Sequence, residues 1–183
     1  MGAFNLDEYV GLAPTHTQSY RHFMGQHLFD RLGLPGEKVH LPDGMAEDRD
    51  AACRAYSESI RALSGLDLQL LGIGTNGHIG FNEPHTRFSS RTHVTPLSAQ
   101  TRRDNGRFFR DPSEVPTHAM TLGIRDILEA REILLVATGA KKARIMAELY
   151  HSDPDEALPA AALKQHPNVT IVLDREAAAL LPG

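Results

Sequence analysis

The sequence predicts an α/β fold, with a mostly parallel sheet flanked by helices, on three observations. Apolar residues recur at helical spacing in 17–32 and in 47–63. Several of the short apolar runs between and after these segments are continuous, which is typical of parallel strands covered on both faces. The runs lie at 66–73, 91–97, 120–124, 133–137 and 169–174. The alternation of the two patterns predicts a Rossmann-like sheet with helices on its faces.

The predicted helices are bounded by helix-breaking residues. The first, at 17–32, carries five apolar residues on one face and is followed by Gly33 and Pro35. The second, at 47–63, ends near Gly65. Cys53 lies on its apolar face, so core packing explains this cysteine better than a nucleophilic role. Two further helices are predicted at 141–150 and 175–181.

Composition limits the class of protein. With 183 residues, 41% of them hydrophobic, the chain suits a single domain spanning 1–183. A net charge of −4 gives no basic field for a nucleic-acid partner. No apolar stretch reaches the roughly 18 residues that a membrane span requires, and no signal peptide is recognisable. Cys53 is the only cysteine, which favours a reducing compartment, and we expect a cytoplasmic protein.

Residues 72–84 carry the most chemical information. They follow the predicted strand 66–73 and contain four glycines, two asparagines, a histidine and a glutamate. Glycine lets the backbone approach a ligand closely, and loops at strand ends commonly carry chemistry. His78 alone would more often be a structural histidine, but with Asn76 and Glu83 in the same loop it is predicted to be an acid/base group.

The same loop contains the pattern Gly-x-Gly-x-x-Gly, which in another context indicates a dinucleotide site. That pattern requires a helix to start at the glycines and an acidic residue roughly 20 positions further on. Gly80 and Pro84 oppose a regular helix, and no Asp or Glu occurs between Glu83 and Asp104. We therefore reject a dinucleotide site.

A metal site is a further alternative for this loop. His78, Glu83 and His85 are suitable zinc ligands, but their spacing matches no familiar zinc pattern. We expect no metal.

Three further residues are candidates for the site, one as a base and two as ligands of an anion. Asp7 follows a short apolar segment; it is either a solvated strand end or, at the carboxyl end of a sheet strand, a base. Arg107, beside Phe108 and Phe109, is a candidate anion ligand. Lys142 lies where a predicted strand turns into a helix, whose free N–H groups are predicted to form a phosphate cradle with it.

Several motifs together closely resemble the glucosamine-6-phosphate deaminases, and the resemblance runs from about residue 4 to about residue 175. The most specific motif is Gly-Ile-Gly-Thr-Asn-Gly-His-Ile-Gly-Phe-Asn-Glu-Pro at 72–84. The others are Phe-Asn-Leu-Asp-Glu-Tyr at 4–9, Ser-Arg-Thr at 90–92, Arg-Phe-Phe at 107–109, Ala-Met-Thr-Leu-Gly at 119–123 and Gly-Ala-Lys-Lys at 139–142.

The resemblance implies a sugar-phosphate isomerase/deaminase-like fold and conversion of glucosamine 6-phosphate to fructose 6-phosphate and ammonium, without a cofactor. It implies that Asp7 moves a proton between carbons 2 and 1, and that His78 opens the sugar ring. Asn76 and Glu83 would orient His78, and Arg107 and Lys142 would bind the phosphate.

The chain also departs from the family. Members begin with a strand, a helix, a second strand and a phosphate loop, which have no counterpart before residue 4. We expect an N-terminally incomplete domain, with an exposed hydrophobic edge and weakened substrate binding.

Other functions remain open from sequence. One is a related sugar-phosphate isomerase or lactonase, since fold does not determine function. Another is an inactive remnant that only binds sugar phosphates. A homo-oligomer also remains open.

Overall fold

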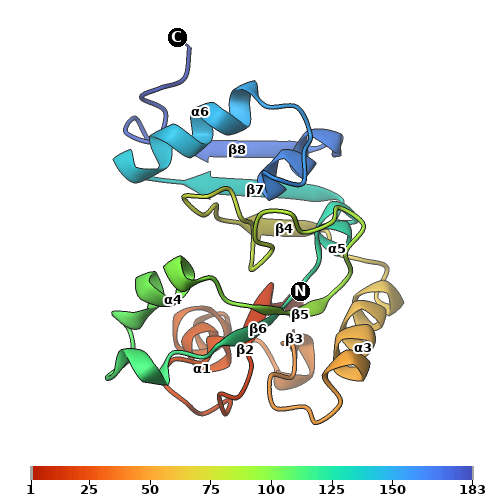
Figure 1. Cartoon of the computed structure of the whole chain (residues 1–183). Helices are drawn as coiled ribbons and strands as arrows, with labels where there is room; N and C mark the ends of the chain where they lie inside the picture. Colours follow the sequence, from red (N-terminus) through yellow and green to blue (C-terminus); the bar gives the residue numbers. More distant parts are fainter. Residues whose placement is uncertain (1, 183) are drawn as a thin grey trace. The chain divides into compact units, whose positions relative to one another are not determined.

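The computed structural model describes residues 2–182, and contacts within the chain divide them into two compact units (Figure 1). The first unit runs up to Ser59 and includes Thr92–Leu122. The second contains Ile60–Arg91 and the chain from Gly123 onward. The prediction of a single domain stays a prediction.

The first unit contains two small sheets. In the larger sheet, β6 (His118–Thr121) lies between β2 (Asp7–Tyr9) and β5 (His93–Pro96), and both pairings are antiparallel. The register places Asp7 and His93 opposite Thr121 on its two sides. The smaller sheet pairs β1 (Ala3–Phe4) with β3 (Val39–His40) in parallel.

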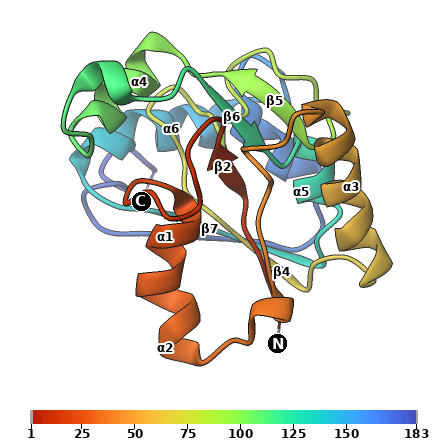
Figure 2. The ribbon, with the colours of Figure 1, turned by 90° about the horizontal axis from the view of Figure 1, so that it is seen from below.

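The helices of the first unit confirm two predictions. Residues 20–32 form one continuous helical stretch, from α1 (Tyr20–Met24) through the π-helical η1 (Gly25–Phe29) to α2 (Asp30–Leu32) (Figure 2). The second predicted helix is α3 (Arg49–Ala62), whose last residues fall in the second unit. Cys53 is buried in it, as predicted. The unit also contains η2 (Gly36–Lys38), α4 (Ala99–Gly106) and η3 (Pro112–Glu114).

The ends of the first helical stretch follow ordinary capping rules. The Ser19 hydroxyl accepts a hydrogen bond from the His22 N–H and so begins α1. Gly33 ends α2 in the left-handed conformation, at φ 59°.

The second unit is a parallel α/β layer. Its strands β4 (Leu68–Leu71), β7 (Glu132–Ala137) and β8 (Val169–Leu173) are parallel in the order β4-β7-β8, which Figure 1 shows one above another. Its helices are α5 (Ile124–Leu128), η4 (Ala140–Lys142), α6 (Ala143–His151) and η5 (Pro159–Gln165).

The strand predictions are confirmed in position, and the sheets are mostly parallel as predicted. Among the described residues, three strand pairings are parallel and two are antiparallel. Both antiparallel pairings involve β6, which pairs with β5 on one side and with β2 on the other. The strand predicted at 120–124 lies two to three residues too late, because β6 begins at His118 and Gly123 caps the start of α5.

Two predictions were wrong in detail. Residues 175–180 form turns rather than a helix, and isolated three- and four-residue bonds replace the continuous ladder that a helix needs. The apolar run that became β4 is not buried on both faces. Its residues alternate, with Leu71 2% exposed but Leu68 and Leu70 52% and 59% exposed, as expected for a strand that is covered on one face.

A buried carboxylate ties β2 to α1 in the first unit. Glu8 Oε1 accepts hydrogen bonds from the Tyr9 and Tyr20 N–H groups at 2.8 and 2.9 Å, and Oε2 accepts one from Arg21 N–H at 2.9 Å. Two of these donors lie in the first turn of α1, which has no helical partner for them. Burial raises the pKa of Glu8, and the three N–H groups oppose that rise.

Within residues 2–182, no helix is both long enough and apolar enough to cross a membrane.

We predict that Glu8→Gln lowers the free energy of unfolding by about 2 kcal/mol, because an amide –NH₂ would then face a backbone N–H in a buried position. Urea unfolding measures this loss. Glu58→Gln, which changes an exposed carboxylate of α3, is the matched control and should stay within about 0.5 kcal/mol of wild type. Equal stability of the two variants would contradict the prediction.

Candidate active site

The loop after β4 is a compact series of turns rather than the start of a helix. Gly74 N–H bonds to His78 O at 2.9 Å, and Gly77 N–H bonds to Gly74 O at 3.1 Å. Gly77 and Gly80 have φ values of 84° and 57°, which glycine adopts without strain. The dinucleotide fingerprint is therefore absent in structure as well, since no helix begins among residues 72–84.

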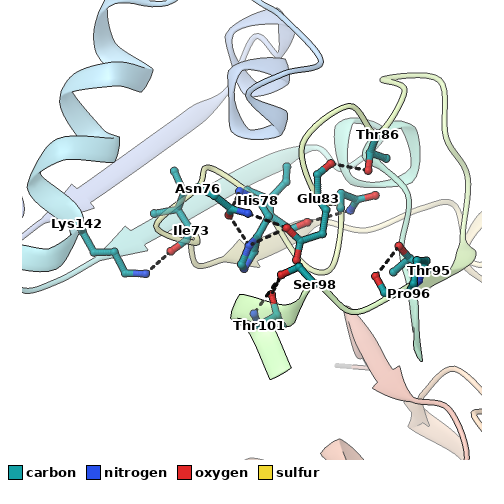
Figure 3. Close-up of polar contacts among 12 residues, drawn as sticks. Ile73, Asn76, His78, Glu83, Thr86, Thr95, Pro96, Ser98, Thr101 and Lys142 are labelled. Atoms are coloured by element: carbon teal, nitrogen blue, oxygen red, sulfur yellow. Dashed lines mark hydrogen bonds and ion pairs between the residues drawn. The ribbon is translucent and has the colours of Figure 1, made fainter. Parts of the chain in front are cut away.

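Three polar side chains of this loop form a hydrogen-bonded chain. Asn76 lies between the other two: its Oδ1 is 2.7 Å from His78 Nδ1, and its Nδ2 donates to Glu83 Oε2 at 2.7 Å (Figure 3). Glu83 Oε2 is 3.8 Å from His78 Nδ1. Glu83 therefore acts on the imidazole chiefly through the Asn76 amide.

This chain determines the tautomer of His78. An ionised carboxylate only accepts, so it requires the –NH₂ of Asn76, and the amide oxygen then turns toward the imidazole. The His78 Nδ1 must carry the hydrogen that this oxygen accepts. In the neutral ring, Nε2 is left with the lone pair and is the atom able to take a proton from a substrate.

The ends of the loop are also anchored. Asn82 is fully buried, and its Nδ2 donates to Ile79 O at 2.9 Å. The Thr86 hydroxyl donates to Glu83 O at 2.7 Å, which holds the backbone of the glutamate. His85 N–H bonds to Glu156 O at 2.6 Å, with His85 itself at a positive φ of 72°.

Two glycines in the loop are required by their surroundings. A Cβ at Gly74 would overlap the His78 ring, with Nε2 only 2.6 Å away. The imidazole therefore lies directly against this backbone. A Cβ at Gly77 would instead overlap the Leu158 side chain, in addition to the strain of its positive φ.

Lys142 belongs to the same unit as this loop. Its Nζ donates to Ile73 O at 2.6 Å, at the carboxyl end of β4 (Figure 3). The side chain is half-buried. The structure thus brings Asn76, His78 and Glu83 together and fixes Lys142 at the start of their loop.

The prediction that free N–H groups at the helix start near Lys142 form a phosphate cradle was wrong for two of these groups. Gly139 N–H donates to Asp174 Oδ2 at 2.9 Å, and Ala140 N–H donates to Glu176 Oε2 at 3.1 Å. Because carboxylates of the same chain already accept from these two N–H groups, the groups are not open to a phosphate.

Asp7 and Arg107 belong to the first unit. Asp7 begins β2, three residues after β1 ends. Burial of its carboxyl group raises its pKa to about 7, and the neighbouring Glu8 charge adds to the rise. A carboxyl group with this pKa is ionised in a large fraction of molecules near neutral pH and takes up a proton readily.

Arg107 caps the end of α4 and is exposed. Its guanidinium lies 4.7 Å from the ring centroid of Phe108, while Phe109 is buried. The stacking holds the guanidinium on an exposed aromatic ring and leaves its N–H edge available to an anion.

Sequence reasoning missed several residues that support the site. Glu8 has no sequence signal beyond its position beside Asp7. Asn82 has one, because an asparagine inside a glycine-rich loop signals a side chain bonded to backbone. The bond between Lys142 and the Ile73 carbonyl has no sequence signal.

In the described part of the chain, no three His, Cys, Asp or Glu side chains gather closely enough to hold a metal ion.

Comparison with known proteins agrees with the geometry. Residues 4–172 match the family of glucosamine-6-phosphate isomerases and 6-phosphogluconolactonases. The glucosamine-6-phosphate deaminase of Shouchella clausii (strain KSM-K16) is 53% identical over 177 residues, covering 97% of this chain and 72% of that protein. That of Arthrobacter sp. (strain FB24) is 49% identical, covering 98% and 69%.

Solved structures show the same relationship. A structure described as a monomeric glucosamine-6-phosphate deaminase superposes with a TM-score of 0.95 at 44% identity, covering 98% of this chain and 74% of that one. A 6-phosphogluconolactonase from Trypanosoma cruzi has a TM-score of 0.75 at 21% identity, which shows a shared fold alone.

These proteins are α/β enzymes that act on phosphorylated sugars. The chain belongs to the glucosamine-6-phosphate isomerase/6-phosphogluconolactonase family, and its relatives at about half identity are glucosamine-6-phosphate deaminases.

We predict that two neighbouring glycine substitutions affect different properties, activity in one case and stability in the other. Gly74→Ala should lower turnover of the enzyme's substrate about 100-fold, because the methyl group displaces the His78 ring, with a stability loss below about 1 kcal/mol. Gly77→Ala should instead lower the free energy of unfolding by about 2 kcal/mol or more, through Leu158 and the positive φ. Parallel activity assays and urea unfolding test the pair, and full activity in Gly74→Ala would show that the ring does not depend on this contact.

We also predict a pH-dependent stability difference for Asp7→Asn. The pKa of Asp7 rises from 3.8 to about 7 on folding, so folding opposes its ionisation. At pH 3 both states are protonated and no cost arises; the cost grows from about pH 4 to 7 and is constant above. Asp7→Asn should therefore be more stable than wild type at pH 8, by about 2 kcal/mol after allowing for the partly exposed side chain.

Urea unfolding at pH 3, 5.5 and 8 measures that difference. A gap between Asp7→Asn and wild type that is the same at all three pH values would show that Asp7 does not titrate as stated.

Proposed function

We propose that this protein converts glucosamine 6-phosphate and water to fructose 6-phosphate and ammonium. The observation that carries the proposal is the chain from Glu83 through Asn76 to His78, which leaves the imidazole Nε2 able to accept and return a proton. Opening a pyranose ring needs such a group, because one proton leaves the anomeric hydroxyl while another reaches the ring oxygen. The deaminase relatives at 53% and 50% identity support the substrate.

In the first step, His78 Nε2 takes the proton of the anomeric hydroxyl and delivers a proton to the ring oxygen. The bond between carbon 1 and the ring oxygen breaks, and an open-chain aldehyde forms. Asn76 and Glu83 hold the ring of His78 during this exchange and stabilise its transient positive charge.

In the second step, the Asp7 carboxylate removes the proton from carbon 2, the ammonium group of the substrate passes a proton to the aldehyde oxygen, and an enolamine forms. The same carboxyl group returns the proton to carbon 1, which leaves an imine at carbon 2. Water adds to this imine and ammonium departs, giving the ketone. A carboxyl group whose pKa lies near 7 suits both the removal and the return of the proton.

Arg107 and Lys142 are the proposed phosphate ligands. The planar guanidinium of Arg107 can bind two phosphate oxygens, and the Lys142 ammonium provides a point charge. Phosphate lies far from the reacting carbons, so its binding energy serves to orient the sugar. No cofactor enters this scheme.

We propose further that residues 1–183 act as one domain of the family, because the family match at 4–172 spans both units. We also propose a cytoplasmic location, since the only cysteine, Cys53, fits a reducing compartment.

Ammonium release from glucosamine 6-phosphate by the purified chain is the test. We expect release by wild type, a loss of about 100-fold or more in His78→Ala, and a similar loss in Asp7→Asn. Arg103→Ala, which changes an exposed arginine of α4, is the control and should keep wild-type rates. Absence of ammonium with hydrolysis of a sugar lactone would instead identify a lactonase.

The pH profile tests the role of Asp7. In wild type, kcat/KM should rise as pH increases through about 7, because only the carboxylate form of Asp7 is a base. A profile that is flat between pH 6 and 8 would exclude Asp7 as the proton acceptor.

A further inference from the structure

Two carboxylates from the end of β8 hold the turn that carries Lys142. Asp174 directly follows β8, and Glu176 lies two residues further along. Their partners, Gly139 and Ala140, lie between β7 and α6. Their hydrogen bonds therefore link the two segments that follow the carboxyl ends of β7 and β8, which are adjacent and parallel.

Asp174 uses both carboxylate oxygens. Its Oδ2 accepts from Gly139 N–H at 2.9 Å, and its Oδ1 accepts from Ala177 N–H at 2.7 Å. The second bond orients the side chain from its own turn, so the first oxygen is presented in a fixed direction. Glu176 Oε2 adds a longer bond of 3.1 Å to Ala140 N–H.

The conformation of the turn at Gly139 and Ala140 depends on the bonds from Asp174 and Glu176. Gly139 has a φ of 86°, a conformation outside the ordinary helical and extended regions, and it directly precedes η4. Its N–H and that of Ala140 lie at a helix start, where no intrahelical partner exists. A carboxylate at such a position both satisfies the donors and stabilises the helix dipole.

The held turn leads directly to Lys142. Lys142 N–H bonds to Gly139 O at 3.0 Å. The backbone of the lysine is therefore bonded to the same residue whose N–H donates to Asp174. At the other end of the side chain, Nζ is placed at Ile73 O. The position of the ammonium thus depends on the Gly139 turn at one end and on β4 at the other.

We propose that Asp174, assisted by Glu176, is a positioning residue for phosphate binding, which acts by holding the Gly139–Lys142 turn. The inference rests on the proposed function, in which Lys142 binds the phosphate of the substrate. In this role the Asp174 carboxylate supports phosphate binding through the turn. Simple electrostatics predicts the reverse, because a carboxylate repels a phosphate.

Positioning and repulsion by Asp174 predict opposite changes in phosphate affinity when its carboxylate is removed. If Asp174 positions Lys142, removing its carboxylate weakens phosphate binding. If it mainly repels the phosphate, removing it strengthens binding. Asp174→Asn separates the two further, because the charge is gone while the amide oxygen can still accept from Gly139 N–H. Unlike Glu8, Asp174 is exposed, so water can solvate the –NH₂ that replaces the second oxygen.

The experiment measures kcat and KM for ammonium release, and the Kd of glucosamine 6-phosphate by calorimetry, for Asp174→Ala and Asp174→Asn. We expect Asp174→Ala to raise KM and Kd about five- to tenfold with kcat within twofold of wild type. Asp174→Asn should stay within about threefold. Asp153→Ala, an exposed carboxylate after α6, is the matched control and should match wild type.

A double-mutant cycle with Lys142→Ala shows whether the effect passes through the lysine. In a Lys142→Ala background, Asp174→Ala should change Kd less than twofold further. The same five- to tenfold loss in that background, tighter binding in Asp174→Ala, or an equal loss in Asp174→Asn would each overturn the proposal. If wild type releases no ammonium, the proposed function fails, but the Kd values still decide the role of Asp174.

Discussion

The hydrogen bond between His78 Nδ1 and Asn76 Oδ1 is the interaction on which the proposed chemistry of this protein depends. It commits the hydrogen of a neutral imidazole to Nδ1, so Nε2 carries the lone pair and is the proposed proton acceptor. Its direction is not set by Asn76 itself, because an amide can be turned either way. Glu83 sets it, since a carboxylate accepts only from the –NH₂ side. The glycines complete the arrangement: Gly74 lets the ring lie against the backbone, and Gly77 and Gly80 turn the loop so that residues 76, 78 and 83 meet.

Both units use carboxylates in the same physical way. Glu8 accepts from N–H groups at the start of α1, and Asp174 and Glu176 accept from N–H groups before α6. In each case the helix start is next to a proposed functional residue, Asp7 in one unit and Lys142 in the other. A helix start presents donors without partners, so a carboxylate there forms strong bonds and fixes the local backbone. The proposed functional side chains are thereby attached to rigid elements, although they lie in loops or at strand ends.

The acid–base properties of Asp7 follow from its place in the first unit. Burial and the adjacent Glu8 both oppose its negative charge, and both raise its pKa. Glu8 can remain beside it because three backbone N–H groups stabilise its own charge. Two neighbouring carboxyl groups therefore have different environments, one suited to structure and one to proton transfer.

The sequence by itself located most of the strands and the longer helices, and it selected the loop that is proposed to carry the chemistry. Apolar patterning suffices to locate β4, β7, β8 and α3 along the chain, because the spacing of apolar residues is a local property of the sequence. The motif at 72–84 sufficed to select Asn76, His78 and Glu83, since glycine, imidazole and carboxylate are rarely combined without a chemical reason. The role of each candidate on the substrate came from family resemblance and not from the pattern.

Only the tertiary structure decided how these groups are connected. The antiparallel direction of β2, β6 and β5 depends on pairings between distant residues, which no local pattern encodes. The one-sided burial of β4 likewise depends on what the fold packs against it. The same is true of the N–H groups predicted to bind phosphate, which Asp174 and Glu176 occupy from 35 and 36 residues away. A side chain's chemistry can be read from its identity, but the atom it bonds to is set by which backbone the fold brings within 3 Å.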